Sequence, residues 1–453
     1  MKPVSLRVSV NAHRARRMAA ALCPLLGMLS LAGAGSAQAD GVPEWLDGFN
    51  YIVTWEGGQI ANIAISGKNG SGRGAPLFDL DSGMPRPAPL RGLPASAAVR
   101  LSGINAAGFR DMAVGGQTTL KLPHGDEVFV HDNRYEHNNG DFTWIGHQGE
   151  NADFRAFFTL GRNGVVIGTV NLPDRTYRIE TVAGEVWLID LTMAGLQPVS
   201  LNDDSRTTTG TAARQTEIAA SSGSTTVDLL ALYTQGLENP VTRINSLVAI
   251  ANQAYVDSQI PVSLRLVGTE SSTYGDNTRN AAALNALTDS SGRLRKTASW
   301  RKEYGADLVT LVRPFIRAKQ KGCGIAWVNG ARHTRLRSKL AFSVVSEGMD
   351  RRGSPYYCDD FTLVHEAGHN FGSVHDRQHA SFDGRYRYSH GYRLPVSGAG
   401  TIMSYFSPRL GYFSNPRILC AGEVCGNARY ADNARSISQT APVVARFRRA
   451  VIP

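Results

Sequence analysis

The stretch "VHEAGHNFGSVHD", residues 364–376, decides which fold we expect for the C-terminal half of this chain. It places three histidines, a glutamate and two glycines within thirteen positions. In an α-helix, positions i and i+4 share one face, so His365 and His369 can bind one metal ion together. Gly372 can adopt backbone angles that other residues resist, which lets the chain turn and bring His375 to the same ion.

Three imidazole ligands leave a fourth position at the ion, which is typical of a catalytic zinc site rather than a closed structural one. Glu366 is adjacent to the first ligand, where it can take a proton from a water molecule in that position. The pattern therefore predicts metal-assisted hydrolysis. The alternatives are solvated or core histidines on a helix, and a closed structural zinc site.

The first 39 residues have the pattern of a secretory signal peptide. Three arginines, Arg14, Arg16 and Arg17, precede the apolar stretch "MAAALCPLLGMLSLAG", and the small residues "SAQA" follow it. We expect cleavage after Ala39, and a retained N-terminal anchor is the alternative. No later run of eighteen or more apolar residues appears in the sequence, which argues against an integral membrane protein.

Four cysteines remain after removal of the signal peptide, and all of them lie in the last third of the chain: Cys323, Cys358, Cys420 and Cys425. An exported protein can keep such residues as disulfides. Three pairings are possible. We favour Cys323–Cys358 and Cys420–Cys425, because the second pair is close in sequence and would close a small loop. A zinc site made from these cysteines is a weaker alternative, since neither pair has CxxC spacing.

Charge and pattern divide the remainder of the chain. Residues 40–223 carry 14 basic and 21 acidic residues, whereas residues 224–453 carry 29 and 17, so the two parts could attract each other. Residues 40–199 contain short strand-like runs separated by turn residues, which predict a mostly β region. Residues 200–223 are small and polar, as expected for a linker that is cleaved.

Residues 224–453 alternate between strand-like and helix-like patterns, which predicts an α/β layer. We expect strands within "TVDLLALYT", "PVSLRLVGTE", "ADLVTLVRPF", "CGIAWV" and "KLAFSVVSE". We expect helices within "NPVTRINSLVAIANQAYVDSQ", across residues 277–303, and within "DFTLVHEAGHNFGSV".

The histidine-rich stretch matches every fixed position of the motif HExxHxxGxxH, and at these residues the sequence resembles the metzincin zinc peptidases. Asp376 follows the motif, as in the reprolysin-like branch. "GTIMSY" supplies Met403 for the methionine-containing turn that this family has beneath the zinc. Together with "VDLLALYT", "GCGIAWV" and "HGYR", these segments most resemble the bacterial peptidyl-Asp metalloendopeptidases, which cut before acidic residues.

The resemblance implies a secreted zinc endopeptidase that is made as a proenzyme. Its fold would be an α/β (α+β) metzincin-like catalytic domain, residues 224–453, with a mixed sheet and an active-site helix, preceded by a mostly β pro-domain. One catalytic Zn²⁺, polypeptide substrates and a pro-region that acts as an intramolecular inhibitor are expected. A monomer without nucleic acid or a membrane anchor is also expected. No cysteine lies between residues 24 and 322, so the zinc-blocking cysteine of some metzincin pro-regions is absent.

Further site residues follow from the resemblance. Tyr405 stands two places after Met403, where other metzincin branches have a tyrosine, and it is a candidate hydrogen-bond donor to the transition state. Packing within the turn is the alternative. The segment "CGIAWV" would lie on the sheet edge that faces the cleft, so an extended substrate would add as a strand beside Gly324, Ile325 and Ala326.

The segment after the methionine turn, "FSPRLGYF", should form a wall of the specificity pocket, with Arg409 as the cation for an acidic side chain. Other candidates are Arg385, Arg387 and Arg393. Each of these arginines could instead be a solvated surface charge. We expect cleavage on the N-terminal side of Asp, with Glu as a second choice.

Other readings remain open. A secreted zinc-binding adhesin or polyanion binder could keep the fold without turnover, but binding alone would not require Glu366. A serralysin-type enzyme is disfavoured because the sequence has no GGxGxD repeat. The basic run "ARHTRLRSK", residues 331–339, predicts a solvated loop, and a contact with nucleic acid or with an acidic surface is the alternative. We expect structural roles for His379 and His390.

Overall fold

The computed structural model describes residues 7–10, 49–56, 59–68, 76–199, 205–207 and 223–451. Contacts within the chain define two compact units, which we describe separately. The first contains residues 1–80, 102–134 and 144–152, and the second contains residues 81–101, 135–143 and 153–453. Apart from strand β1, the expected signal peptide lies outside the described residues, as does most of the expected linker. None of the described helices combines the length and apolar character that crossing a membrane requires.

The first unit is built mainly from antiparallel strands. One sheet has the order β1 (Arg7–Val10), β2 (Phe49–Glu56) and β3 (Gln59–Lys68). A hairpin joins β6 (Gln117–Leu122) to β7 (Gly125–Glu136), and the larger part of β8 (Phe142–Gln148) also belongs here. The short helix α2 (Ala106–Asp111) starts where the Asn105 side chain accepts a hydrogen bond from the Gly108 amide, at 2.8 Å.

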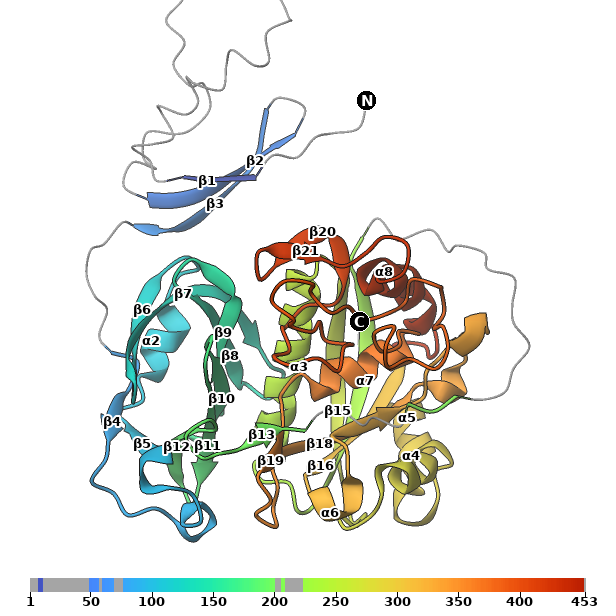
Figure 1. The fold of residues 1–453 in the computed structure, drawn as a ribbon, viewed down its shortest axis with the longest axis horizontal. Helices are drawn as coiled ribbons and strands as arrows, with labels where there is room; N and C mark the ends of the chain where they lie inside the picture. The colour runs from blue at the N-terminus through green and yellow to red at the C-terminus, as the bar shows by residue number, and fades with distance from the viewer. Residues whose placement is uncertain are drawn as a thin grey trace, which may run out of the picture. The chain divides into compact units, whose positions relative to one another are not determined.

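The second unit begins with an antiparallel meander, coloured green in Figure 1, which we call the β meander. Its strands are β9 (Asn151–Leu160), β10 (Val166–Asn171), β11 (Thr176–Val182) and β12 (Glu185–Asp190), with β5 (Ala98–Ser102) paired to β12. β11 and β12 are joined by Ala183 and Gly184, both with positive φ. A two-residue hairpin loop with this geometry matches the twist of the strands that it connects.

A mixed sheet forms the centre of the second unit. Its strands are β14 (Thr225–Thr234), β15 (Val262–Ser272), β16 (Leu308–Pro314), β17 (Gly324–Ala326), β18 (Phe342–Met349) and β19 (Tyr356–Cys358). β14 is parallel to both β15 and β16, and β16 is parallel to β18. β17 and β19 pair antiparallel with β18, and the short strand β13 (Gln197–Pro198) runs parallel to β19.

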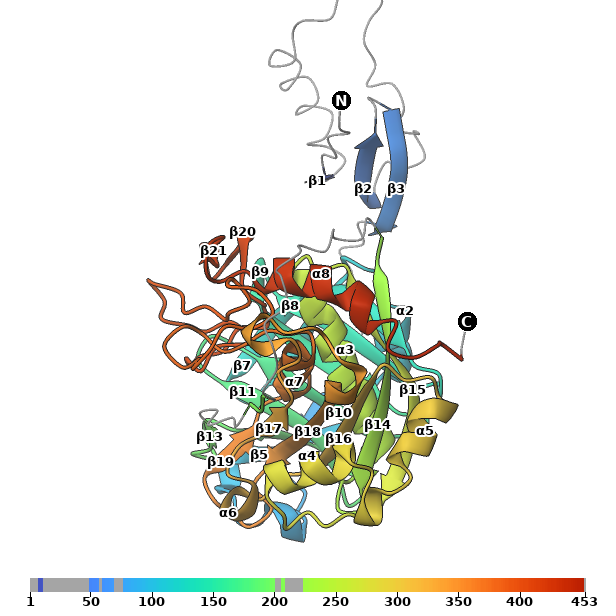
Figure 2. The same ribbon diagram turned by 90° about the vertical axis from the view of Figure 1, so that its right-hand side faces the viewer.

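Helices cover both faces of this sheet because side chains of β14 alternate between two cores. Val227, Leu229 and Ala231 pack with α3 (Pro240–Asp257), α7 (Thr362–Asn370) and α8 (Asn433–Val444). Leu230 and Leu232 pack on the other face with α4 (Asn280–Thr288). Figures 1 and 2 show the resulting layers, in which α3 and α7 lie against the sheet. Burial on both faces accounts for the nearly continuous apolar run in β14.

The sequence patterns located most of these elements, with one clear difference. Residues 277–303 form two helices, α4 and α5 (Thr297–Glu303), because Ser290 and Gly292 have positive φ and end the first helix. The remaining short elements are β4 (Asp79–Asp81), α6 (Arg317–Gln320), β20 (Asn415–Cys420), β21 (Glu423–Cys425) and the 3₁₀ turns η3 (Ala88–Leu90), η4 (Ala95–Ala97), η5 (Gly292–Leu294), η6 (Ala331–His333) and η7 (Ser338–Leu340).

Both disulfides that we favoured are present. Cys323–Cys358 joins the residue before β17 to the end of β19, four positions before the start of α7. Cys420–Cys425 closes the β20–β21 hairpin. The first bond therefore links a sheet edge to the segment that leads into the helix with the histidine motif.

A buried ion cluster joins the β meander to the mixed sheet and its helices. Arg178 of β11 donates to Glu347 at 2.6 Å and to Asp360 at 3.1 Å, and it also contacts Glu180. Arg243 of α3 lies 3.4 Å from both Glu180 and Glu347. Because these groups are taken out of water together, removing one partner would leave an uncompensated buried charge.

Candidate metal centre

Helix α7 positions two of the three histidines, and its local sequence determines where it begins and ends. The Thr362 hydroxyl donates to the Asp359 carbonyl at 2.8 Å at the start of the helix. At the other end, the Gly372 amide donates to His369 O and the Ser373 amide to Gly368 O, each at 2.9 Å. Gly372 has φ +90°, so a glycine is needed for this helix end.

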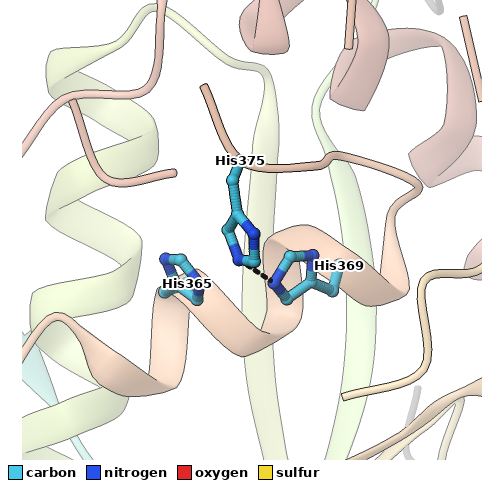
Figure 3. A group of neighbouring side chains, drawn as sticks. All are labelled: His365, His369 and His375. Atoms are coloured by element: carbon cyan, nitrogen blue, oxygen red, sulfur yellow. Dashed lines mark hydrogen bonds between the residues drawn. The ribbon is translucent and has the colours of Figure 1, made fainter. Parts of the chain in front are cut away.

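The three histidines converge at one buried point. His365, His369 and His375 are at most 4% exposed, and the nitrogen atoms that they offer lie within 4.8 Å of one another. Figure 3 shows the first two on α7 and the third reaching back from the chain after the turn. The Nε2 atoms of His369 and His375 are 3.1 Å apart. Among the described residues, this is the one group that could hold a metal ion.

Hydrogen bonds set which ring nitrogen of each helical histidine points to this site. His365 Nδ1 lies 2.8 Å from Ile402 O, and His369 Nδ1 lies 2.9 Å from Ser373 O. A carbonyl can only accept, so both Nδ1 atoms carry the proton and both Nε2 atoms present a lone pair. Such backbone partners also fix the ring orientation of metal-binding histidines.

Glu366 is fully buried on α7, next to the edge strand β17. A Cβ atom added at Gly324 would overlap with its Oε1 atom, so a side chain at position 324 would displace the carboxylate. This contact explains the glycine at the start of β17. Our sequence analysis had assigned Gly324 only to the substrate edge.

The turn that contains Met403 lies under α7. Met403 is fully buried, and a Cβ atom at Gly368 would lie 2.6 Å from its Sδ atom. Asp376 holds the same turn, since it accepts from the Ser404 hydroxyl at 3.1 Å and from the Tyr405 amide at 3.0 Å. Burial raises the pKa of the Asp376 carboxyl, but these bonds and one from His379 more than offset that effect, so the pKa lies below its usual value.

Comparisons with known proteins agree with this geometry. Residues 218–431 match the model of the family described as metallo-peptidase family M12B, reprolysin-like. Residues 98–193 match the BamI lipocalin-like domain.

Residues 218–431 are therefore similar to a reprolysin-like metallopeptidase domain.

Two curated relatives carry the name peptidyl-Asp metalloendopeptidase. The protein from Pseudomonas aeruginosa is 30% identical over 52% of this chain and 42% of its own length. That from Xanthomonas campestris is 29% identical over 68% of this chain and 76% of its own length. The chain thus spans less than half of the first relative. Metalloproteinase-II from Bacteroides fragilis, a solved structure, has a TM-score of 0.39 and 14% identity over 57% of this chain and 81% of that chain, a likeness too low to support an argument.

A reprolysin-like metallopeptidase domain implies a bound metal, and the donor set fits one. Three imidazoles are buried around a single point, two of them with lone pairs turned toward it by backbone carbonyls. Neutral imidazoles suit zinc among other transition metals.

Tyr405 lies beside the third histidine of the candidate metal site. The centre of its ring is 4.2 Å from that of His375 and 5.1 Å from that of His379. His379 in turn pairs with Asp376 at 2.8 Å. His390 donates Nδ1 to the carbonyl of His375 at 2.9 Å, so it supports the backbone of the third histidine.

The outer edge of β17 pairs with a segment of the chain itself. The Arg206 amide donates to Ala326 O at 3.0 Å, and the Val328 amide donates to Arg206 O at 2.8 Å, in a parallel arrangement. Asn370, directly after His369, donates its Nδ2 to Trp327 O at 3.0 Å, which ties this edge to α7. The sequence analysis did not identify Asn370. A polar residue on the buried face of a predicted helix would have indicated such a hydrogen bond to a neighbouring segment.

The four arginine candidates differ in their surroundings. Arg409 lines a cavity of about 430 Å³ together with residues after the Met403 turn, and it pairs with Asp359. Arg385, Arg387 and Arg393 do not line this cavity. Arg385 donates to His333 O at 3.1 Å, and the guanidinium of Arg393 lies over the Phe406 ring at 4.4 Å.

Replacing His369 with alanine should abolish zinc binding, because two remaining imidazoles hold the ion far more weakly than three. We expect one zinc per chain in the parent protein and close to none in His369→Ala, measured by inductively coupled plasma mass spectrometry after dialysis. His124→Ala, in the turn between β6 and β7, is the control and should retain zinc. An unchanged zinc content in His369→Ala would exclude this site.

Proposed function

We propose that this chain is a zinc-dependent endopeptidase that hydrolyses peptide bonds. The observation that carries the proposal is the convergence of His365, His369 and His375, with Glu366 adjacent on the same helix and facing the edge strand β17. The names of the curated relatives support the same reaction.

When bound, zinc would supply a Lewis acid that lowers the pKa of a water molecule and polarises a carbonyl. The Nε2 atoms of His365 and His369 and a ring nitrogen of His375 would hold it. Glu366 would take the proton from the attacking water and then pass it to the nitrogen of the leaving amine. Its burial supports this role, because packing holds the carboxylate in one place beside the three histidines.

Tyr405 would donate a hydrogen bond to the oxyanion that forms on the substrate carbonyl. Two observations support this role. Its ring lies 4.2 Å from that of His375, and Asp376 holds its amide at 3.0 Å, so the residue is fixed next to the metal site.

An extended substrate would bind as a further strand beside Gly324, Ile325 and Ala326. Main-chain pairing of this kind accepts many sequences, because it uses groups that every residue has. The pairing of Arg206 beside Trp327, with bonds to Ala326 and Val328, supports the idea, since it places another segment of backbone at the end of this edge. Sequence choice would then depend on a side-chain pocket.

We propose that the enzyme prefers Asp, with Glu as a second choice, immediately after the cleaved bond. Arg409 is the cation that would receive this side chain. It lines the cavity beside the segment that follows Met403, and its own side chain is only 8% exposed, so a charge-assisted hydrogen bond there would be poorly screened.

The domain division that we expect from the sequence completes this proposal. Residues 1–39 would direct secretion, residues 40–199 would be a pro-region, and cleavage within residues 200–223 would release the catalytic domain, residues 224–453. The mature enzyme would act as a monomer outside the cell, without nucleic acid or a membrane anchor as a partner.

The pro-region and the linker that follows it would inhibit the enzyme through one contact each. The Arg206 backbone occupies the edge of β17 where a substrate would pair. The Arg178 side chain, from the β meander, is bound to Glu347 and Asp360 of the catalytic part. No cysteine is needed for latency of this kind, which agrees with the absence of cysteine between residues 24 and 322.

The alternative function is zinc-dependent adhesion or polyanion binding with little turnover. Glu366 distinguishes the two, because binding does not need a proton acceptor next to the metal. Its complete burial beside Gly324 favours the hydrolase.

The main test identifies every new N-terminus after incubation of a denatured protein substrate with the processed enzyme, using mass spectrometry. We expect termini that begin with Asp, and no cleavage by Glu366→Ala or by the chelator-treated enzyme. New termini that begin with other residues would still support the peptidase activity but would contradict the preference for Asp. No cleavage by zinc-loaded, processed protein would favour the adhesin.

Tyr405→Phe removes the hydroxyl and keeps the ring. We expect kcat to fall about a hundredfold, with KM and zinc content little changed, because the lost hydrogen bond would act only in the transition state. Tyr430→Phe, at an exposed tyrosine, serves as the control. An unaffected kcat in Tyr405→Phe would assign this tyrosine to packing alone.

Arg178→Met should weaken inhibition by the pro-region, because it removes the guanidinium that neutralises buried Glu347 and Asp360. In the uncleaved chain, we expect peptide hydrolysis to rise at least tenfold over the parent. Arg175→Met is the matched control, since its partners Asp174 and Asp190 both belong to the β meander. Equal latency in the two variants would contradict a role of Arg178 in docking.

A further inference from the structure

The cavity beside Arg409 lies within the second unit and is lined by both apolar and polar side chains. Its apolar side chains include Tyr357 of β19, Phe361 directly before α7, and Phe406 and Pro408 after the Met403 turn. Residues 197–199 form a further part of its wall. In such surroundings a hydrogen bond between charged groups is stronger than it is in water.

Arg409 is held at both its backbone and its side chain. Its backbone segment pairs with Gly400, since the Gly400 amide donates to Pro408 O at 2.9 Å and the Leu410 amide donates to Gly400 O at 2.8 Å. Its side chain binds Asp359 side-on, through Nε at 3.1 Å and through Nη2.

Asp359 is itself fixed by the start of α7. Its Oδ1 atom accepts from the Phe361 amide at 3.0 Å, and its carbonyl accepts from the Thr362 hydroxyl at 2.8 Å. Its Oδ2 atom is therefore directed at Arg409. The preceding residue, Cys358, is tied to Cys323 by a disulfide, which further limits movement of this segment.

One edge of the Arg409 guanidinium has no partner in this arrangement. Nη1 is buried and makes no hydrogen bond among the described residues, although the side chain is only 8% exposed. A buried donor without a partner is unfavourable, because it loses its bonds to water, so such a group in a folded protein needs an explanation. A guanidinium can bind one carboxylate through Nε and Nη2 and a second through its Nη1 end.

The other charged groups at the cavity bind one another. Arg178 donates to Glu347 and Asp360, and Asp360 also lies 3.7 Å from Arg243. Among the charged residues that line the cavity in the described chain, Arg409 is the one with a buried guanidinium nitrogen that makes no hydrogen bond.

We propose that Asp359 is a positioning residue for substrate specificity: it holds Arg409 side-on, so that Nη1 donates to the carboxylate of the substrate residue after the cleaved bond. This inference rests on the proposed endopeptidase function. Because Asp359 neutralises Arg409, the pocket would select an acidic side chain by hydrogen-bond geometry rather than by net positive charge. The wall formed by residues 197–199 would have to leave before a substrate enters.

The test uses the processed enzyme and two peptides that differ only in Asp or Ala after the cleaved bond. In Asp359→Asn, the Phe361 amide keeps an acceptor, but the oriented carboxylate opposite Arg409 is lost. We expect the ratio of kcat/KM for the Asp peptide to that for the Ala peptide to fall about tenfold, mainly through KM of the Asp peptide. A loss of structure alone would lower both peptides together and leave the ratio unchanged.

Asp432→Asn is the matched control, because Asp432 also accepts from the first turn of a helix, α8, and also pairs with an arginine, Arg417, but does not line the cavity. Its ratio should equal that of the parent. Arg409→Met should lose the acidic preference completely. If Asp359→Asn does not cleave the Ala peptide, Asp359→Ser, which also keeps an oxygen for the helix start, replaces it.

The outcomes separate this inference from the proposed function. A parent enzyme that cleaves both peptides equally would reject the acidic preference itself. A parent with the preference, an Arg409→Met variant without it, and an unchanged or increased ratio in Asp359→Asn would overturn the positioning role of Asp359 alone. A reduced ratio in Asp359→Asn with a normal ratio in Asp432→Asn would establish it.

Discussion

The convergence of three imidazoles on one buried point is the constraint on which the rest of this structure depends. Two of them come from successive turns of α7, and the third must return from beyond the helix end. The turn at Gly372, with φ +90°, makes that return possible within three residues. The carbonyls of Ser373 and Ile402 then orient the helical histidines, so the Met403 turn has to lie directly beneath α7.

Close packing around α7 follows from this requirement, and glycines make it possible. Gly368 admits the Met403 sulfur, and Gly324 admits the Glu366 carboxylate, at positions where a Cβ atom would collide. Asn370 adds a hydrogen bond from the end of α7 to Trp327, directly after β17, and Asp376 adds one between the segment after the helix and the Met403 turn. A site built in this way is preorganised, because each reacting group is held by packing and by a second group behind it.

Charged groups have a separate role, which is to connect segments that lie far apart in the sequence. Arg178 joins the β meander to Glu347 and Asp360, and Arg409 joins the segment after Met403 to the start of α7 through Asp359. From the sequence, the acidic excess of residues 40–223 and the basic excess of residues 224–453 predicted only a general attraction between these two parts. In the folded protein, the attraction is made by individual buried ion pairs. Which two segments a pair connects determines which contact is lost when that pair is removed.

Local periodicity allowed the sequence by itself to determine the metal centre and much of the α/β layer. The spacing of His365, His369 and His375 depends only on the helix repeat and on one glycine, and the strands and α3 follow from runs of apolar residues. The two disulfides were favoured from spacing among three possible pairings.

Only the tertiary structure decided which strands run antiparallel, that Gly324 packs on Glu366, and that Arg409 binds Asp359. These features depend on contacts between residues about 10 to 50 positions apart, and no local pattern records them. The break between α4 and α5 was missed for a different reason, since a positive φ at Ser290 is unusual for a residue other than glycine.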